Sequence, residues 1–168
     1  MSGLSMGGHE RPMALSEDWI TPPEILKVLG PFDLDPCASV TQPWPTASKQ
    51  YTIYDNGLLK EWSGRVWLNP PYGQQAARWL ARLSEHGNGI ALIFARTETD
   101  MFFRWVWERA DALLFLRGRI VFCRPNGQRA NGNAGAPSVL VAYGAVNVEA
   151  LRTCGIDGQF VRLERGKP

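Results

Sequence analysis

The chain has 168 residues, of which 45% are hydrophobic and 20% charged, a composition that excludes a disordered or fibrous protein and predicts one folded domain. A net charge of +2 excludes a polycation, and no apolar run is long enough to predict a membrane span. The three cysteines, Cys37, Cys123 and Cys154, lack the paired spacing of a zinc site or a disulfide framework, so a reduced intracellular protein without a metal is expected.

Residues 1–15 are rich in Gly and Ser and lack the apolar segment of a signal peptide, so they predict a flexible leader before a domain of residues 16–168. Positive charge is concentrated near the C-terminus. Residues 117–168 carry eight basic and three acidic side chains, a charge of +5, and the rest of the chain therefore carries −3. Such a basic region fits a phosphate backbone, and it equally fits a solvated face.

The first half of the chain predicts one helix and several short strands. Thr21 is the expected N-cap of a helix that Pro22 and Glu24 favour and that Gly30-Pro31 ends. A turn is expected at Asp55-Asn56-Gly57. The predicted strands are residues 32–35, weakly 51–54, and 66–68, with a loop over 39–48.

The second half alternates helical and strand patterns more strongly. Helices are predicted over residues 74–86 and 99–110, strands over 89–95, 112–116, 120–122 and 138–143, and a mobile loop over 124–136. The apolar run of residues 89–95 is typical of a buried parallel strand. Alternating strands and helices indicate an α/β fold, in which ligands bind beyond the carboxyl ends of the strands.

The most informative segment is Asn69-Pro70-Pro71-Tyr72, which directly follows a predicted strand. The two prolines stiffen this turn, so the Asn69 side-chain oxygen and the Pro70 carbonyl become fixed acceptors for a planar amino group. Tyr72 adds an aromatic face. A Pro-rich turn that only shapes the fold is the alternative.

Two acidic segments also follow predicted strands. Asp35, ahead of Pro36, could pair with the ammonium or ribose hydroxyls of a small ligand, or it could be a solvated Asp before a turn. Asp55 belongs to a segment that resembles a motif whose Asp contacts the amino group of a cofactor, or it could belong to an ordinary Asp-Asn-Gly turn.

In their order along the chain, the motifs Asp18-Trp19 with Thr21-Pro22, Asp35-Pro36-Cys37-Ala38, and Asn69-Pro70-Pro71-Tyr72 resemble the phage-type DNA N6-adenine methyltransferases over roughly residues 16–144. This resemblance implies a reduced Rossmann-like methyltransferase sheet, mostly parallel with an antiparallel last strand and with helices on both faces. One departure is that Cys37-Ala38-Ser39 stand where the family's cofactor turn usually has glycines, so the backbone would approach the cofactor less closely.

The resemblance also implies the chemistry. S-adenosylmethionine would be held by a set of residues that follow the family's cofactor motifs: Trp19, Thr21, Pro22, Asp35, Pro36, Cys37, Ala38 and Asp55. Asn69, Pro70, Pro71 and Tyr72 would hold a flipped-out adenine of double-stranded DNA while the methyl group is transferred directly. The expected location is the cytoplasm of a bacterial host of a phage or prophage, with a monomer expected and a dimer as the alternative.

The sequence says least about DNA readout, because no separate recognition insert is present. Candidates for DNA contact are the arginines in and around the predicted loop of residues 124–136, together with one at a strand end: Arg96, Arg117, Arg119, Arg124 and Arg129. The loop could also be a surface segment with incidental arginines, and Arg96 could face a structural carboxylate. Other acceptors (cytosine N4, RNA or a protein amide) remain open, as does a non-catalytic DNA-binding module with a decayed methyltransferase fold.

Overall fold

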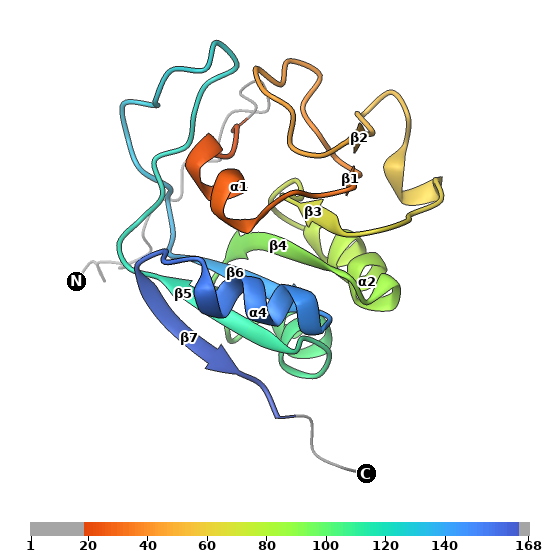
Figure 1. The fold of residues 1–168 in the computed structure, drawn as a ribbon, viewed down its shortest axis with the longest axis vertical. Helices are drawn as coiled ribbons and strands as arrows, with labels where there is room; N and C mark the ends of the chain where they lie inside the picture. The colour runs from red at the N-terminus through yellow and green to blue at the C-terminus, as the bar shows by residue number, and fades with distance from the viewer. Residues whose placement is uncertain (1–18, 165–168) are drawn as a thin grey trace, which may run out of the picture.

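A computed structural model describes residues 19–164 of the protein. The expected leader, residues 1–15, and Asp18 lie outside this part of the chain. The described residues form a seven-stranded sheet in the order β2-β1-β3-β4-β6-β5-β7 (Figure 1). Its strands are β1 (Leu34–Asp35), β2 (Lys49–Gln50), β3 (Val66–Leu68), β4 (Gly89–Phe94), β5 (Ala112–Leu116), β6 (Ser138–Tyr143) and β7 (Gly158–Arg162).

One half of the sheet is parallel and the other is antiparallel. Strand β1 pairs in parallel with β2 and β3, and β3 pairs in parallel with β4. Strand β6 runs antiparallel to both β4 and β5, and β7 runs antiparallel to β5. The prediction of an antiparallel strand over residues 138–143 is therefore confirmed, whereas the antiparallel β7 beyond it was not predicted.

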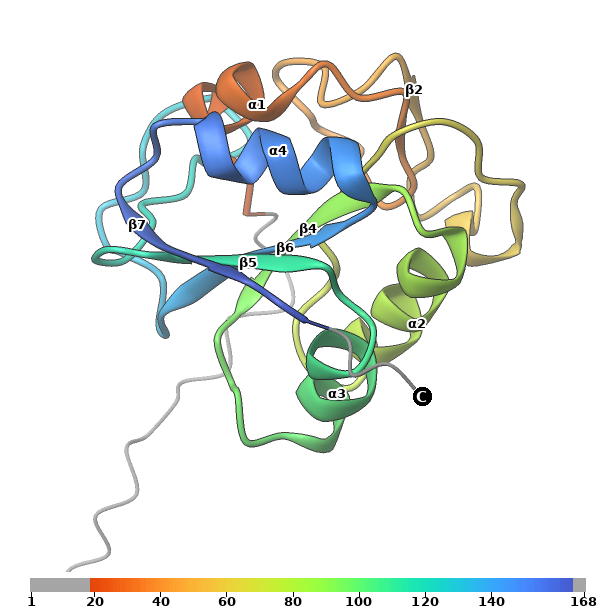
Figure 2. The same cartoon turned by 60° about the horizontal axis from the view of Figure 1, so that its bottom comes forward.

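Helices cover both faces of the sheet, as the sequence predicted. In Figure 2, α1 (Pro23–Leu29) and α4 (Ala145–Thr153) lie on one face, and α2 (Ala76–His86) and α3 (Asp100–Phe102) lie on the other. Two clusters of buried apolar side chains fill the space between these layers and the sheet. Between β1 and β2 the chain forms neither a helix nor a strand, so the first crossover is short and irregular.

The predicted strand over residues 51–54 is wrong. The strand at this edge is β2, because the carbonyl of Asp33 accepts a hydrogen bond from the Lys49 amide and that of Asp35 accepts one from Tyr51. Beyond Tyr51 the chain turns, because the Asp55 carboxylate accepts hydrogen bonds from both the amide and the hydroxyl of Thr52. A 3-10 turn, η1 (Gly57–Leu59), follows.

Two further predictions need correction. Residues 120–122 form no strand, and the regular pairing there consists of isolated bridges from Cys123 to Ile20 and to Arg129. The helix predicted over residues 99–110 starts at the Thr99 cap, but after α3 it widens into the π-helical turn η2 (Phe103–Trp107). No helix among residues 19–164 is both long enough and apolar enough to cross a membrane.

Candidate active site

A cavity of about 660 Å³ lies beyond the carboxyl ends of β1 and β3. Strands that run in parallel present these ends at the same edge, which is why segments distant in sequence meet there. The cavity is lined by parts of four segments, residues 19–21, 35–46, 52–57 and 67–79. Among the predicted site residues, those that line it are Trp19, Thr21, Asp35, Pro36, Cys37, Ala38, Asn69, Pro70, Pro71 and Tyr72.

Asn69 holds its side-chain amide in one orientation. Its Nδ2 donates to the Thr21 hydroxyl at 3.2 Å and, over a longer 3.5 Å, to the backbone carbonyl of Trp19. Its Oδ1 is buried and receives no hydrogen bond from the described residues. Buried acceptors are normally paired, so this unpaired Oδ1, on a residue that lines the cavity, has the capacity to accept a hydrogen bond from an amino group that reaches it.

Thr21 therefore has a different position from the one predicted. Helix α1 begins at Pro23 with Pro22 as its N-cap residue, and no side chain caps it, so the prediction of Thr21 as the N-cap is wrong. The Thr21 side chain is 3% exposed, and its Oγ1 contacts Asn69 instead. Pro22 is buried but does not line the cavity.

Tyr72 continues the wall after the two prolines. Its ring is stacked on Phe94 at the end of β4, with ring centroids 4.2 Å apart and planes inclined by 12°. Its hydroxyl is buried and has no partner among the described residues, and burial raises the pKa of Tyr72, so it stays neutral. Tyr72 thus offers a rigid aromatic surface and no charge.

Asp35, at the end of β1, is a buried carboxylate, 3% exposed. Burial raises its pKa to about 6, although hydrogen bonds from the Thr46 hydroxyl (2.5 Å) and from the Cys37 amide (3.1 Å) oppose that rise. A carboxylate has about four acceptor positions, so these two bonds leave capacity for a ligand. A carboxyl pKa raised in this way by burial is common among functional carboxylates.

Cys37 occupies the turn in which glycines were expected. Its thiol donates to the backbone carbonyl of Asn69 at 3.3 Å, and burial raises its pKa, so it remains a neutral thiol. The next residue, Ala38, donates its amide to the carbonyl of Tyr51. This turn is thus bonded to the segment containing Asn69 and to the chain beyond β2.

Asp55 is exposed and does not line the cavity. Its carboxylate faces its own turn, where the hydrogen bonds from Thr52 lower its pKa. Its neighbours Thr52, Ile53 and Asn56 line the cavity instead, and sequence reasoning missed them. Ile53 is 84% exposed, and an exposed apolar side chain beside a cavity can indicate a binding surface. Only the structure reveals this exposure, so the sequence alone could not have identified Ile53.

Most of the predicted DNA-contacting arginines have partners within the protein. Arg117 pairs with Asp157 at 3.0 Å, Arg119 donates to the carbonyl of Gly135 at 3.1 Å, and Arg129 pairs with Glu24 of α1. The Arg96 guanidinium lies over the ring of Phe94, 5.8 Å from its centroid. Phe94 is also the residue on which Tyr72 stacks. Arg124 is exposed, and its side chain has no partner within residues 19–164.

The loop of residues 124–136 lies next to the segments that line the cavity. Ile20 and Cys123 exchange two backbone hydrogen bonds of 2.9 Å each, which join the start of this loop to the Trp19–Thr21 segment. A Cβ at Gly127 would stand 3.4 Å from the Trp44 ring. Figure 1 shows the loop rising beside α1 toward the chain that connects β1 with β2.

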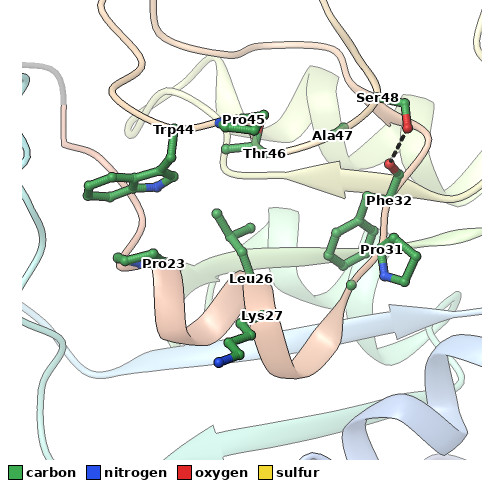
Figure 3. Close-up of a pocket in the computed structure, with 11 residues that line it drawn as sticks. Pro23, Leu26, Lys27, Pro31, Phe32, Trp44, Pro45, Thr46, Ala47 and Ser48 are labelled. Atoms are coloured by element: carbon green, nitrogen blue, oxygen red, sulfur yellow. Dashed lines mark hydrogen bonds between the residues drawn. The ribbon is translucent and has the colours of Figure 1, made fainter.

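A second, smaller cavity of about 430 Å³ contains none of the predicted site residues (Figure 3). It lies between α1 and residues 44–48 and is mostly apolar, with Leu26, Phe32 and Trp44 in its wall. Thr46 belongs to both cavities, so one loop separates them.

Within residues 19–164, no group of three or more His, Cys, Asp or Glu side chains could hold a metal ion. The sequence matches the family described as DNA N-6-adenine-methyltransferase (Dam) over residues 9–152. Neither the curated proteins nor the solved structures gave a significant match.

Proposed function

The chain belongs to the DNA N-6-adenine-methyltransferase (Dam) family, and on that premise we propose that it methylates the 6-amino group of adenine in double-stranded DNA, with the larger cavity as its active site. The family implies S-adenosylmethionine as the methyl donor and DNA as the substrate. What supports this site is the buried, unpaired Oδ1 of Asn69 in the wall of a cavity that also contains Asp35.

The adenine amino nitrogen is a weak nucleophile because its lone pair is conjugated with the ring. Asn69 Oδ1 and the Pro70 carbonyl would each accept one of its hydrogen atoms. Two fixed acceptors draw the nitrogen toward tetrahedral geometry and direct its lone pair away from the ring. S-adenosylmethionine, when bound, would supply an electrophilic methyl group on a sulfonium: the new N–C bond would form as the C–S bond breaks, S-adenosylhomocysteine would leave as a neutral thioether, and the methylated nitrogen would release one proton to water. The protein's contribution is positioning and electrostatics, and no cysteine nucleophile is needed.

The cavity has the properties that such a cofactor requires. Its volume of about 660 Å³ lies within the ~300–1,000 Å³ of cofactor sites. Asp35 provides a buried carboxylate for the cofactor ammonium or ribose, and Trp19, Thr21, Pro36, Cys37 and Ala38 form the surrounding wall. Pro22 would act only by holding this wall, and Asp55 would act only by holding its turn, through its hydrogen bonds from Thr52. We propose that the mixed sheet is a reduced Rossmann-like methyltransferase fold.

An adenine inside a duplex cannot reach the cavity, so the base would flip out of the helix. Tyr72 would stack on the flipped base, because only one face of its ring is needed for Phe94. The loop of residues 124–136 and Arg96 would face the DNA beside the cavity. Of the arginines near this loop, Arg124 is the best candidate for a phosphate contact, since Arg117, Arg119 and Arg129 have partners in the protein.

Two alternatives keep the fold. Cytosine N4, RNA or a protein amide could be the acceptor, although an Asn at position 69 favours adenine by the family resemblance. A non-catalytic DNA-binding module is favoured by one observation, the absence of glycines in the Asp35–Ser39 turn. Such a non-catalytic module should show no binding of S-adenosylmethionine in calorimetry.

The function can be tested by mapping modified bases in the DNA of cells that express the protein. N6-methyladenine at a recurrent sequence context, absent from cells with an empty vector, is the expected result. Modified cytosine would move the acceptor to the first alternative, and unmodified DNA from cells with soluble protein would contradict the proposal.

A further inference from the structure

The amide of Asn69 has two ends with opposite hydrogen-bonding character, and only one of them can serve an amino group. Oδ1 accepts, whereas Nδ2 donates. If the amide turned by 180°, the cavity would present a donor to the substrate amine, and the two groups would repel each other. Something in the protein must therefore fix which end faces the cavity.

The two partners of Nδ2 fix this choice. A hydroxyl such as that of Thr21 can donate or accept, so alone it would tolerate either orientation. The backbone carbonyl of Trp19 can only accept, so it favours Nδ2 on its side. At 3.5 Å this second bond is long, whereas the bond to Thr21 Oγ1 is 3.2 Å. Together they turn Oδ1 away from the Trp19–Thr21 segment.

The segment that carries these partners is itself held on both sides. Ile20, between Trp19 and Thr21, is 2% exposed and exchanges two backbone hydrogen bonds with Cys123. Directly after Thr21, Pro22 and Pro23 restrict the backbone at the start of α1. The backbone at Thr21 is thus fixed on both sides, which fixes the position of its hydroxyl.

From this geometry we propose that Thr21 is a positioning residue: its hydroxyl, which makes the shorter of the two bonds to Nδ2, anchors the Asn69 amide in the orientation that the Trp19 carbonyl selects, so that Oδ1 faces the target amino group. This role of the hydroxyl is additional to the place of Thr21 in the cavity wall, which Thr21→Val leaves filled. This inference rests on the proposed function for its effect on catalysis, but the orientation of the amide can be measured without activity.

The kinetic test compares Thr21→Val, which keeps the shape and removes the acceptor, with Thr21→Ser, which keeps the hydroxyl. Thr21→Val should lower kcat by about 10- to 100-fold, because small misplacements of reacting groups have effects of this size. The Kd for S-adenosylmethionine should stay within about twofold of wild type, as for an interaction that acts only on the chemical step. Thr21→Ser should restore most of kcat.

Thr99→Val is the matched control. Thr99 also uses its hydroxyl, as the N-cap of α3 and as a donor to the Arg96 carbonyl, and it does not line the cavity. Losing such a cap costs about 1 kcal/mol of stability. Thr99→Val therefore shows how a loss of stability alone affects kcat, and we expect its kcat to stay near wild type. In an Asn69→Ala background, Thr21→Val should have no further effect on kcat. A full additional loss there would overturn the proposal, as would a wild-type kcat for Thr21→Val.

A direct readout separates this inference from the proposed function. In the ¹⁵N-labelled protein, the side-chain NH₂ resonances of Asn69, assigned by their loss in Asn69→Ala, should shift in Thr21→Val and stay unchanged in Thr99→Val. If the wild-type protein transfers no methyl group, the proposed function fails, yet this shift still supports the positioning contact. Unchanged Asn69 resonances in Thr21→Val would overturn the inference whatever the activity.

Discussion

The rings of Tyr72 and Phe94 are stacked, with centroids 4.2 Å apart and planes inclined by only 12°. Tyr72 belongs to the turn after β3 and Phe94 ends the neighbouring strand β4, so the stack joins two adjacent strand ends. A base entering the cavity would extend this stack by one ring.

This relationship predicts which part of Tyr72 matters. Tyr72→Phe removes a buried hydroxyl that has no partner in the described residues, so stability should be unchanged or rise by up to about 1 kcal/mol. Tyr72→Ala should lower kcat/KM for DNA by about 5- to 150-fold, since base–aromatic stacking contributes ~1–3 kcal/mol. Steady-state kinetics and thermal unfolding check both variants. Equal losses for Phe and Ala would show that the hydroxyl, not the ring, is used.

The pKa of Asp35 predicts how cofactor affinity depends on pH. Burial raises this pKa to about 6, so below pH 6 the group is increasingly protonated and cannot pair with an ammonium. Binding a cation favours the carboxylate, so the Kd for S-adenosylmethionine should fall as pH rises through 6, by up to tenfold per unit below it, and level off above. Calorimetry at pH 5 to 8 measures this.

Asp35→Asn supplies the control for that curve, because its side chain does not titrate. Its Kd should be weaker than wild type at pH 7.5 and nearly flat between pH 5 and 8. The same slope in both proteins would assign the titration to another group and remove Asp35 from the cofactor site.

Ile53 and Tyr54 form a matched pair of exposed apolar neighbours. They are 84% and 87% exposed, but only Ile53 lines the cavity. If a bound cofactor covers Ile53, Ile53→Ala should raise the Kd by about 10- to 150-fold, because burying such a side chain contributes ~1.5–3 kcal/mol. Tyr54→Ala should leave it unchanged. Both should alter the free energy of unfolding by less than about 0.5 kcal/mol, and a Kd that responds equally to both would contradict the assignment.

Arg124 should act on DNA through charge alone. Arg124→Ala should weaken DNA binding across sequences and reduce the slope of log K against log salt by about 1. Arg152 pairs with Glu149 on α4, so the control variant Arg152→Ala should change neither the DNA affinity nor the salt slope. Arg129→Ala should also lower stability, since it breaks contacts with Glu24 and with the Val121 carbonyl. Fluorescence anisotropy at several salt concentrations distinguishes the three, and an unchanged slope for Arg124→Ala would rule out its phosphate contact.

Local patterns in the sequence were sufficient to predict that Asp35 and Asn69 lie at one edge of the sheet, where both line the larger cavity. Asp35 is the last residue of β1 and Asn69 directly follows β3, and parallel strands bring such ends together, so their convergence follows from topology. The buried strands β4, β5 and β6 could also be predicted, because a short continuous apolar run is typical of a strand that is buried on both faces of a sheet.

Contacts between distant segments could not be predicted in this way. Thr21 meets Asn69 48 positions away, and the pairing of Ile20 with Cys123 that places it has no local signal. The same holds for Arg117 and Arg129, whose partners Asp157 and Glu24 are far along the chain. Strand β7 was missed because it is a largely exposed edge strand without an apolar run.

The most direct test of the central claim is methyl transfer from labelled S-adenosylmethionine to unmethylated double-stranded DNA, with the labelled base identified after digestion. We predict label in N6-methyladenine for the wild-type protein. Asn69→Ala should lower transfer by at least about 100-fold, the usual size of the effect of removing a fixed hydrogen-bonding group at the reacting centre, while its cofactor Kd stays near wild type. An absence of labelled adenine across varied DNA sequences, or an Asn69→Ala protein that keeps the wild-type rate, would contradict the account.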